Sequence, residues 1–336
     1  MKIAINSPAF PPQIGGLEEV ARICAEEFTR KGHDVTVITE AQNEPHVEFP
    51  FSVHRKATLR ERLQTFQSAD VVLMFNFSMK ALPLVLLSKT PLVISHQGWY
   101  GPGEQAITLK ALMKIFASRW TATNVACSNS VARYVGTKTH CIPNPYNDQF
   151  FKLRPQVARE RDFLFVGRLV SDKGANIFVD ALAKLHRSGV RSRSTITGSG
   201  PEEWALIDQV KQTGLADSIS FTGPLRGELL AKEMNRHRCL VVPSRWAEPF
   251  GIVALEGVAS GCIVIGSNAG GLPEAIGPGG VTFPNGDTHS LAERMKEAMV
   301  SIQLNKSQVE HHLDIHRGER IAENYLRVLL NQAKRC

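Results

Sequence analysis

Two glutamates stand eight positions apart in the stretch 248–256, EPFGIVALE, with a glycine between them. The second, Glu256, lies in an apolar run, where a carboxylate is costly to bury unless it has a partner. A proline and a glycine before the run mark the start of a helix. The free amides of Phe250, Gly251 and Ile252 would then point at an anion.

Glu248 precedes this helix start, and its negative charge would repel an anion bound there. We therefore expect its carboxylate to accept hydrogen bonds from hydroxyl groups, as a sugar provides. At 1.5 Å per helical residue, Glu256 would lie about 12 Å further along, roughly the span from a sugar across a diphosphate to a ribose. A carboxylate that grips two ribose hydroxyls would explain Glu256. The alternative is a buried carboxylate paired with an arginine or with backbone amides.

Two cations follow the apolar strand pattern at 163–166, in the stretch 167–174, GRLVSDKG. Arg168 and Lys173 could hold a diphosphate, because arginine suits bidentate contacts and lysine acts as a point charge. A solvated charged loop is the alternative. The turn at 198–202, GSGPE, is only a weak match to the dinucleotide-binding fingerprint, since the third glycine is missing and no strand follows with an acidic residue placed for a ribose.

A glycine pair, Gly15 and Gly16, ends the loop 6–16 that follows the first strand pattern. Glycines at a helix N-terminus let backbone amides approach a phosphate or a sugar closely. A long loop that needs two flexible residues explains the pair equally well.

These residues all lie at the ends of short apolar strand patterns that alternate with amphipathic helical patterns. The first block begins with a strand at 2–5 and a helix at about 17–31, and it ends with a strand at 124–128. The second block runs from 163–166 to a strand near 280–283. The alternation predicts an α/β protein with two doubly wound, Rossmann-like domains, whose parallel sheets bind ligands beyond the carboxyl ends of their strands.

The domain boundary is predicted in the polar, basic stretch 152–162. We expect an N-terminal domain at 1–152, a C-terminal domain at 153–315, and a C-terminal helix at 316–336 that packs back on the N-terminal domain. A chain of 336 residues has room for two domains of ordinary size.

The composition narrows the class of protein. The net charge of +7 is spread over both halves, which favours anionic ligands over a nucleic-acid patch. Apolar runs are far shorter than the ~20 residues of a membrane span, and the chain opens into a strand pattern without the layout of a signal peptide. None of the six cysteines forms a CxxC pair, which suits reduced thiols. We therefore expect a soluble, cytoplasmic protein.

Together these patterns resemble the retaining glycosyltransferases of the GT-B fold, family 4 (glycosyltransferase group 1). The pair Glu248 and Glu256 matches the E-x7-E motif of that family. Further motifs stand in the family's order over nearly the whole chain: PP and GG within 11–16, GHDVTV at 32–37, IPN at 142–144, GR and KG within 167–174, GSGPE at 198–202 and GGLPE at 270–274.

The resemblance implies two domains that face a cleft and a role for each motif residue. Glu256 would bind the donor ribose, and Arg168 and Lys173 the diphosphate, while Glu248 orients the donor sugar with three backbone amides. His96, in SHQG at the end of a predicted strand, matches the family's histidine near the reacting centre; without the family it is an ordinary polar loop residue. The implied catalytic residues are His96, Glu248, Arg168 and Lys173, and the implied donor-binding residues are Gly15, Gly16, Arg168, Lys173, Glu248, Phe250, Gly251, Ile252 and Glu256.

The resemblance also implies transfer of a hexose or N-acetylhexosamine from a nucleotide diphosphate sugar to a sugar or glycolipid acceptor, with retention, in glycan biosynthesis such as that of lipopolysaccharide. Uridine is the first choice of base and guanosine the second. The sequence holds no Asp-x-Asp motif, so we expect neither an obligatory metal nor a cofactor. The alternatives are a GT-B nucleotide-sugar epimerase without an acceptor and a non-catalytic sugar-nucleotide binding protein. A NAD-dependent dehydrogenase would need a GxGxxG turn that neither half offers.

One stretch bears on the acceptor. Residues 105–120 are apolar and basic, with Lys110, Lys114 and Arg119 and no acidic residue. This composition suits a helix on the anionic inner face of a membrane, as an enzyme with a lipid-linked acceptor would use. The alternative is a helix packed within the first domain with its lysines at the rim.

Overall fold

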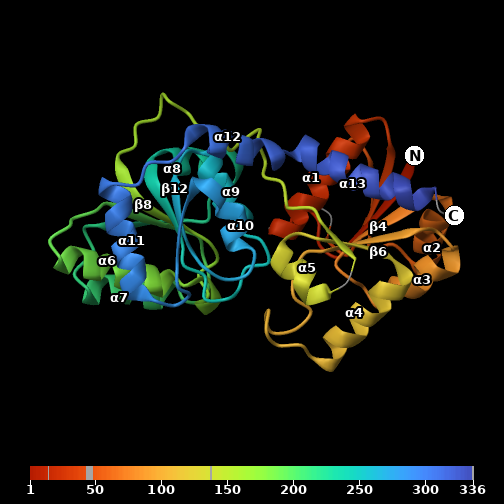
Figure 1. The fold of residues 1–336 in the computed structure, drawn as a ribbon, viewed down its shortest axis with the longest axis horizontal. Coiled ribbons are helices and arrows are strands. Elements are labelled where there is room, and N and C mark those ends of the chain that lie inside the picture. The colour runs from red at the N-terminus through yellow and green to blue at the C-terminus, as the bar shows by residue number, and fades with distance from the viewer. Residues whose placement is uncertain (14, 43–47, 137, 335–336) are drawn as a thin grey trace. The chain divides into compact units, whose positions relative to one another are not determined.

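The computed structural model of the chain (Figure 1) describes residues 1–13, 15–42, 48–136 and 138–334. It divides into two compact units, of which unit 1 comprises Met1–Asn147 with Ile315–Cys336, and unit 2 comprises Asp148–Asp314. The observed boundary lies five residues before the expected one. None of the helices in the described part of the chain is long and apolar enough to cross a membrane.

Unit 1 is built on a seven-stranded parallel sheet in the order β3-β2-β1-β4-β5-β6-β7. Helices α1 and α13 cover one face, and α2 to α5 cover the other (Figure 1). The strands are β1 (Lys2–Ser7), β2 (Asp34–Thr39), β3 (Ser52–Arg55), β4 (Val71–Phe75), β5 (Leu92–His96), β6 (Thr123–Ala126) and β7 (Thr139–Cys141), and the helices are α1 (Gly16–Arg30), α2 (Leu59–Ser68), α3 (Leu82–Ser88), α4 (Leu109–Thr121), α5 (Asn129–Val135) and α13 (Gly318–Ala333).

The local sequence explains these elements. All five residues of β4, VVLMF, are buried, as in a central parallel strand covered on both faces. Helix α13 buries Tyr325 and other apolar residues at helical spacing and packs against α1. Gly318 lies at this contact, where an added Cβ would stand 2.7 Å from Ile23 Cγ2. The C-terminal segment of the chain is thus part of unit 1.

Unit 2 is built on a six-stranded parallel sheet in the order β10-β9-β8-β11-β12-β13. Helices α6, α7 and α11 cover one face, and α8, α9 and α10 the other (Figure 1). The strands are β8 (Arg161–Val166), β9 (Ser194–Thr197), β10 (Ile219–Gly223), β11 (His237–Val242), β12 (Ile263–Ser267) and β13 (Gly280–Phe283), and the helices are α6 (Ala175–Arg187), α7 (Glu203–Gln212), α8 (Gly227–Asn235), α9 (Ile252–Ala259), α10 (Leu272–Ile276), α11 (Thr288–Val300) and α12 (Lys306–Ile315).

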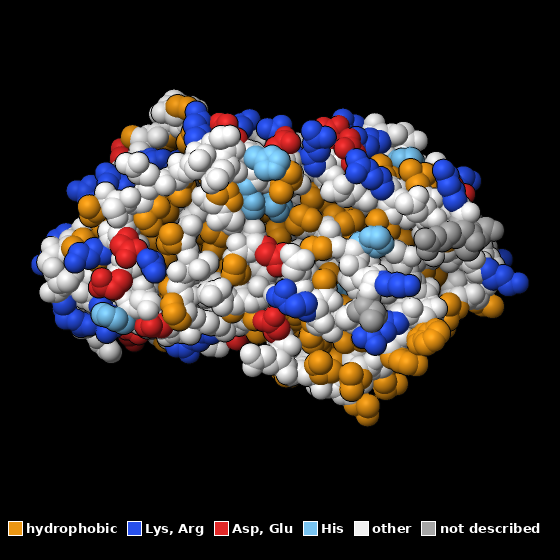
Figure 2. Space-filling model, viewed as in Figure 1, with side chains coloured by type: hydrophobic (Ala, Val, Ile, Leu, Met, Phe, Trp, Pro, Cys, Tyr) orange, Lys and Arg blue, Asp and Glu red, His pale blue; other side chains and the backbone are white. Residues whose placement is uncertain are grey.

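The prediction of two parallel-sheet, Rossmann-like domains is confirmed, and the expected cleft stays a prediction. The sequence patterns missed β3 and β7, two edge strands of four and three residues. Their residues are only half-buried or exposed, so they carry no apolar run. Figure 2 adds that hydrophobic side chains remain at the surface over α4, where they are at least half exposed at several positions.

Candidate functional site

The carboxyl edge of the unit 2 sheet carries three loops that are joined through their backbones. The Leu169 amide, after β8, donates to the carbonyl of Ser199, after β9, at 2.9 Å, and the Glu202 amide donates back to Leu169 at 3.1 Å. The Arg245 amide, after β11, donates to the Asp172 carbonyl at 2.8 Å. The predicted diphosphate loop is therefore held from both sides.

Glycines allow these loops to approach so closely. An added Cβ at Gly174 would stand 2.1 Å from the carbonyl oxygen of Pro243, and one at Gly198 would stand 1.8 Å from that of Gly167. Gly174 also has a φ of +70°, which L side chains rarely adopt. Gly174 and Gly198 thus serve loop packing, a role that the sequence did not reveal.

Lys173 and Glu248, expected to bind different parts of a donor, are bonded to each other. The Lys173 Nζ donates to Glu248 Oε1 at 2.6 Å, and the Ser244 hydroxyl donates to the same oxygen at 2.7 Å. The side chains of Lys173 and Glu248 are 24% and 11% exposed, respectively. The Gly271 amide donates to the Glu248 carbonyl at 2.7 Å and fixes the backbone at this point. Arg168 is exposed on the same loop as Lys173.

Ser244 and the glycine pair after β12 were missed as supports of Glu248. Ser244 directly follows the buried strand β11 and a proline, which is the only signal in the sequence that marks it. The contact from Gly271 joins parts of the chain that are 23 positions apart, and pattern reasoning has no access to such a pair.

Helix α9 begins at Ile252, after Gly251 with a φ of 101°. Glu248 lies outside this helix, in a parallel bridge with Gly270. The helical rise of 1.5 Å per residue that underlies the estimate of 12 Å therefore applies only to the steps from Ile252 to Glu256. The N-cap residue Gly251 has no side chain that could cap the first amides of α9. Free amides at a helix start suit an anion, and the donor role expected for the amides of Phe250, Gly251 and Ile252 stays a prediction.

Glu256 is half-buried on α9, a helix of otherwise apolar or small residues. The next residue, Gly257, faces the sheet, where an added Cβ would stand 2.5 Å from Leu240 Cδ2 on β11. The close contact between helix and sheet holds α9 in place. Phe250, the predicted amide donor before the helix, is buried.

His96 is at the end of β5 in unit 1, as predicted, but its ring is wholly buried. Its Nδ1 lies 2.6 Å from the Tyr100 hydroxyl, and its Nε2 lies 2.8 Å from Asn124 Oδ1. Burial lowers the pKa of His96 to about 4, so the ring is neutral at pH 7. Both ring nitrogens thus bond to neighbours within unit 1. The catalytic role that the resemblance implies for His96 stays a prediction.

Gly15 and Gly16 are exposed at the start of α1, where Gly15 has an extended backbone. The first turn of α1 is acidic, with Glu18 and Glu19. An added Cβ at Gly15 would stand 2.5 Å from Glu18 Oε2, so that carboxylate lies directly at the helix start. A bound phosphate would be repelled there, and a hydroxyl group of a sugar suits this end of α1 better.

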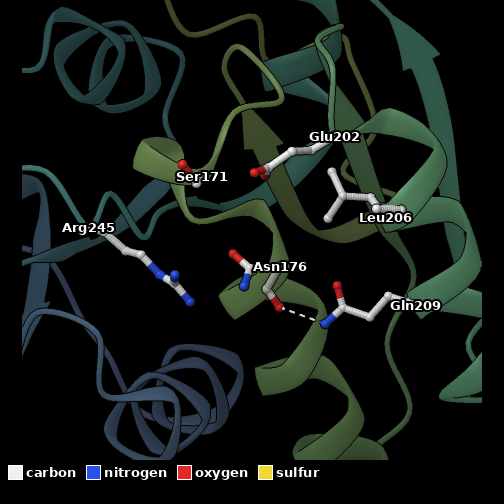
Figure 3. A pocket seen from close by; sticks show the side chains of 7 residues that line it. Ser171, Asn176, Glu202, Leu206, Gln209 and Arg245 are labelled. Atoms are coloured by element: carbon white, nitrogen blue, oxygen red, sulfur yellow. Dashed lines mark hydrogen bonds between the residues drawn. The ribbon is translucent and has the colours of Figure 1, made fainter.

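A hollow of about 250 Å³ lies on the α6 and α7 side of the same sheet edge (Figure 3). The Arg245 side chain points into it from one side and Glu202 from the other, and the side chain of Asn176 lies between them. None of the predicted site residues lines it; the lining residues are Ser171, Asn176, Glu202, Ala205, Leu206, Gln209 and Arg245. Within the described residues, no cluster of His, Cys, Asp and Glu could hold a metal ion.

The edge of unit 2 thus combines the groups that a charged, hydroxyl-bearing ligand needs. Arg168 and Lys173 supply positive charge, the start of α9 supplies amides, and Glu248 supplies a carboxylate anchored at one oxygen. Such a set can hold a diphosphate next to hydroxyl groups.

Comparisons with known proteins agree with this division of the chain. Residues 14–150 match the model of "Glycosyltransferase Family 4", and residues 148–310 match that of "Glycosyl transferases group 1". The glycogen synthase of Mycobacterium tuberculosis is 36% identical over 140 residues, which are 41% of this chain and 34% of that protein. The chain therefore aligns with about a third of that relative. An uncharacterized glycosyltransferase of Methanocaldococcus jannaschii is 26% identical over 324 residues, with 82% of this chain and 83% of that protein covered.

Solved structures share the fold. HepE from Anabaena, crystallised in complex with UDP, superposes with a TM-score of 0.81 at 20% identity and covers 98% of this chain and 100% of its own. The sucrose-phosphate synthase of Thermosynechococcus elongatus superposes with a TM-score of 0.76 at 20% identity, with 100% of each chain covered. The chain thus has the two Rossmann-like domains of GT-B structures, and its two parts match the models of a Family 4 and of a group 1 glycosyltransferase domain, in that order.

Proposed function

We propose that the protein transfers a hexose or N-acetylhexosamine from a nucleotide diphosphate sugar to a sugar or glycolipid acceptor, with retention and without a metal. The observation that carries the proposal is the cluster of Lys173, Glu248 and the start of α9 on one edge of unit 2. UDP is the first choice of donor nucleotide, and the similarity to HepE, solved with UDP, supports it. GDP is the second choice.

In this proposal each group of the edge has one task. Arg168 and the remaining protons of Lys173 hold the diphosphate, and the amides at the start of α9 add to that positive field. Glu248 accepts the hydrogen bond from Lys173 at Oε1, and its other carboxylate oxygen accepts hydrogen bonds from the sugar hydroxyls. Glu256 binds the ribose. His96 acts as a positioning residue that holds the end of β5.

The chemistry requires one bond to form and one to break on the same face of the sugar. The acceptor oxygen attacks the anomeric carbon while the bond from that carbon to the diphosphate oxygen breaks. The bonding electrons pass to the leaving diphosphate, whose oxygen takes the proton of the acceptor hydroxyl. Arg168, Lys173 and the amides of α9 stabilise the charge that develops on the leaving group.

The first test is thermal unfolding of the purified protein with UDP, GDP, ADP and NAD in turn. A nucleotide at 100 times its dissociation constant adds about 2.7 kcal/mol, or roughly 5–10 °C for a domain of this size. We expect a shift with one nucleoside diphosphate that weakens in Glu256→Ala. Glu202→Ala is the matched control, because Glu202 is a carboxylate on the same edge that lines the hollow instead.

The donor site would be refuted if only NAD shifted the melting temperature, or if none of the nucleotides did. Incubation with the matching nucleotide sugar then separates the classes of function. A transferase joins the sugar to an acceptor with its anomeric configuration kept, as NMR of the product shows. An epimerase leaves the sugar on the nucleotide in altered form, and a binding protein leaves it unchanged.

A further inference from the structure

Helix α4 has two apolar faces, of which only one is packed. Ala111, Ile115 and Ser118 are buried against unit 1 and are mostly small. The opposite face carries larger apolar side chains at positions i, i+3, i+4, i+7 and i+11, which form one stripe. Their exposed fractions are 75% for Leu109, 51% for Leu112, 54% for Met113, 64% for Phe116 and 78% for Trp120.

Helix α3 extends this stripe into a patch. Leu86 and Leu87 at the end of α3 are 51% and 64% exposed. Both helices lie on the same face of the sheet, and Ala117 of α4 packs against the core cluster that contains Val85 of α3. Figure 2 shows hydrophobic side chains gathered over these two helices. A continuous apolar surface on this scale marks an interaction site, because single exposed apolar residues are common and gathered ones are rare.

The charged residues within 105–120 and at the end of α3 have one sign. Residues 105–120 hold three cations and no carboxylate. Lys114 lies over the Tyr100 ring at 4.8 Å, and Arg119 donates to the Val135 carbonyl, so both stay near the helix. Lys110 is exposed on α4 beside the stripe, and Lys89 is exposed at the end of α3. An apolar patch with a positive rim is complementary to an anionic lipid surface.

We propose that this patch of α4 and α3 docks unit 1 on an anionic lipid bilayer. Its 13 residues make α4 about 20 Å long, which suits a helix that lies in the plane of the interface. Leu112, Met113 and Phe116 enter the boundary between headgroups and acyl chains. Trp120 lies at the level of the headgroups with its ring half immersed, and Lys110 contacts anionic headgroups. The inference does not depend on sugar transfer.

The test is binding of the full chain to vesicles of phosphatidylcholine alone and with a third phosphatidylglycerol, by flotation. We expect binding to the anionic vesicles that falls about tenfold or more in the variant Leu112→Glu with Phe116→Glu. Leu229→Glu on α8 is the matched control, since Leu229 is 64% exposed in unit 2, as Phe116 is in unit 1. It should bind as the wild type does. Binding should also fall as NaCl rises from 50 to 500 mM.

The depth of Trp120 gives an independent measure. Brominated acyl chains quench tryptophan fluorescence only at short range, so they should quench the wild type. Trp120→Phe should lose most of this quenching, and Trp204→Phe should keep it, because Trp204 is 79% exposed on α7 in unit 2. An unchanged nucleotide shift in the variants would show that unit 2 is intact.

Several outcomes would overturn the proposal. One is the absence of binding to anionic vesicles, and another is equal quenching in Trp120→Phe and the wild type. A third is a dimer by light scattering that Leu112→Glu converts to a monomer without any vesicle binding. In that case a second copy of the chain covers the patch.

Discussion

Replacing Gly174 by alanine tests whether close loop contact positions the predicted diphosphate site. Gly174 has a φ of +70° and an added Cβ would stand 2.1 Å from the Pro243 carbonyl oxygen. Gly214 has a φ of +71° in the same unit, but nothing lies within 4 Å of its added Cβ. The two substitutions therefore share the backbone cost of a positive φ and differ only in the clash.

The expected magnitudes follow from these distances. A positive φ costs an L residue about 1–2 kcal/mol, which both variants pay. At Gly174 one loop must also move by about 0.9 Å, from 2.1 Å to the 3.0 Å below which Cβ contacts essentially do not occur. Forcing such a shift in packed structure costs about 1–3 kcal/mol. With roughly 2–4 °C per kcal/mol, Gly174→Ala should unfold about 2–12 °C below Gly214→Ala.

The assay is thermal unfolding followed by circular dichroism, with and without a nucleoside diphosphate. Gly174 is next to Lys173, so its displacement should also reduce the nucleotide shift, whereas Gly214→Ala should keep that shift in full. Equal melting temperatures for the two variants would refute the claim that the loops are held by this contact. An equal nucleotide shift would refute the link to the site.

Two further predictions concern charged and titratable groups. Lys173→Met removes the cation from the largely buried carboxylate of Glu248 and should cost about 1–3 kcal/mol. Adding Glu248→Gln should recover part of that loss in a double-mutant cycle on melting temperatures, whereas strict additivity would contradict the pair. Burial lowers the pKa of His96 in the folded state to about 4, below the ordinary value of 6.5. The contribution of the neutral ring to the free energy of unfolding is therefore present above pH 6.5 and is lost as the pH falls toward 4. By pH 5 this loss is about 2 kcal/mol, and His96→Asn should show a smaller drop in melting temperature between pH 7.5 and 5; equal drops would count against the buried neutral ring.

The sequence by itself determined the class of fold and the order of its parts. Strands such as 71–75 and 163–166 are short apolar runs with helical patterns between them, and this local pattern can be read without any tertiary information. It also placed the candidate residues on loops after strands, because parallel sheets bring their carboxyl ends to one edge. The edge strand 52–55 was not predicted, because its exposed and half-buried residues do not form an apolar run.

Only the tertiary structure decided which of those residues meet. The bond from Lys173 to Glu248 joins loops 75 positions apart, and its partners are set by sheet order and by glycines that let the loops touch. The same holds for His96, whose position was predicted but whose side chain turns into the core to bond with Tyr100 and Asn124. A sequence pattern encodes the direction of a residue relative to its own strand or helix, whereas its contacts depend on packing between distant segments.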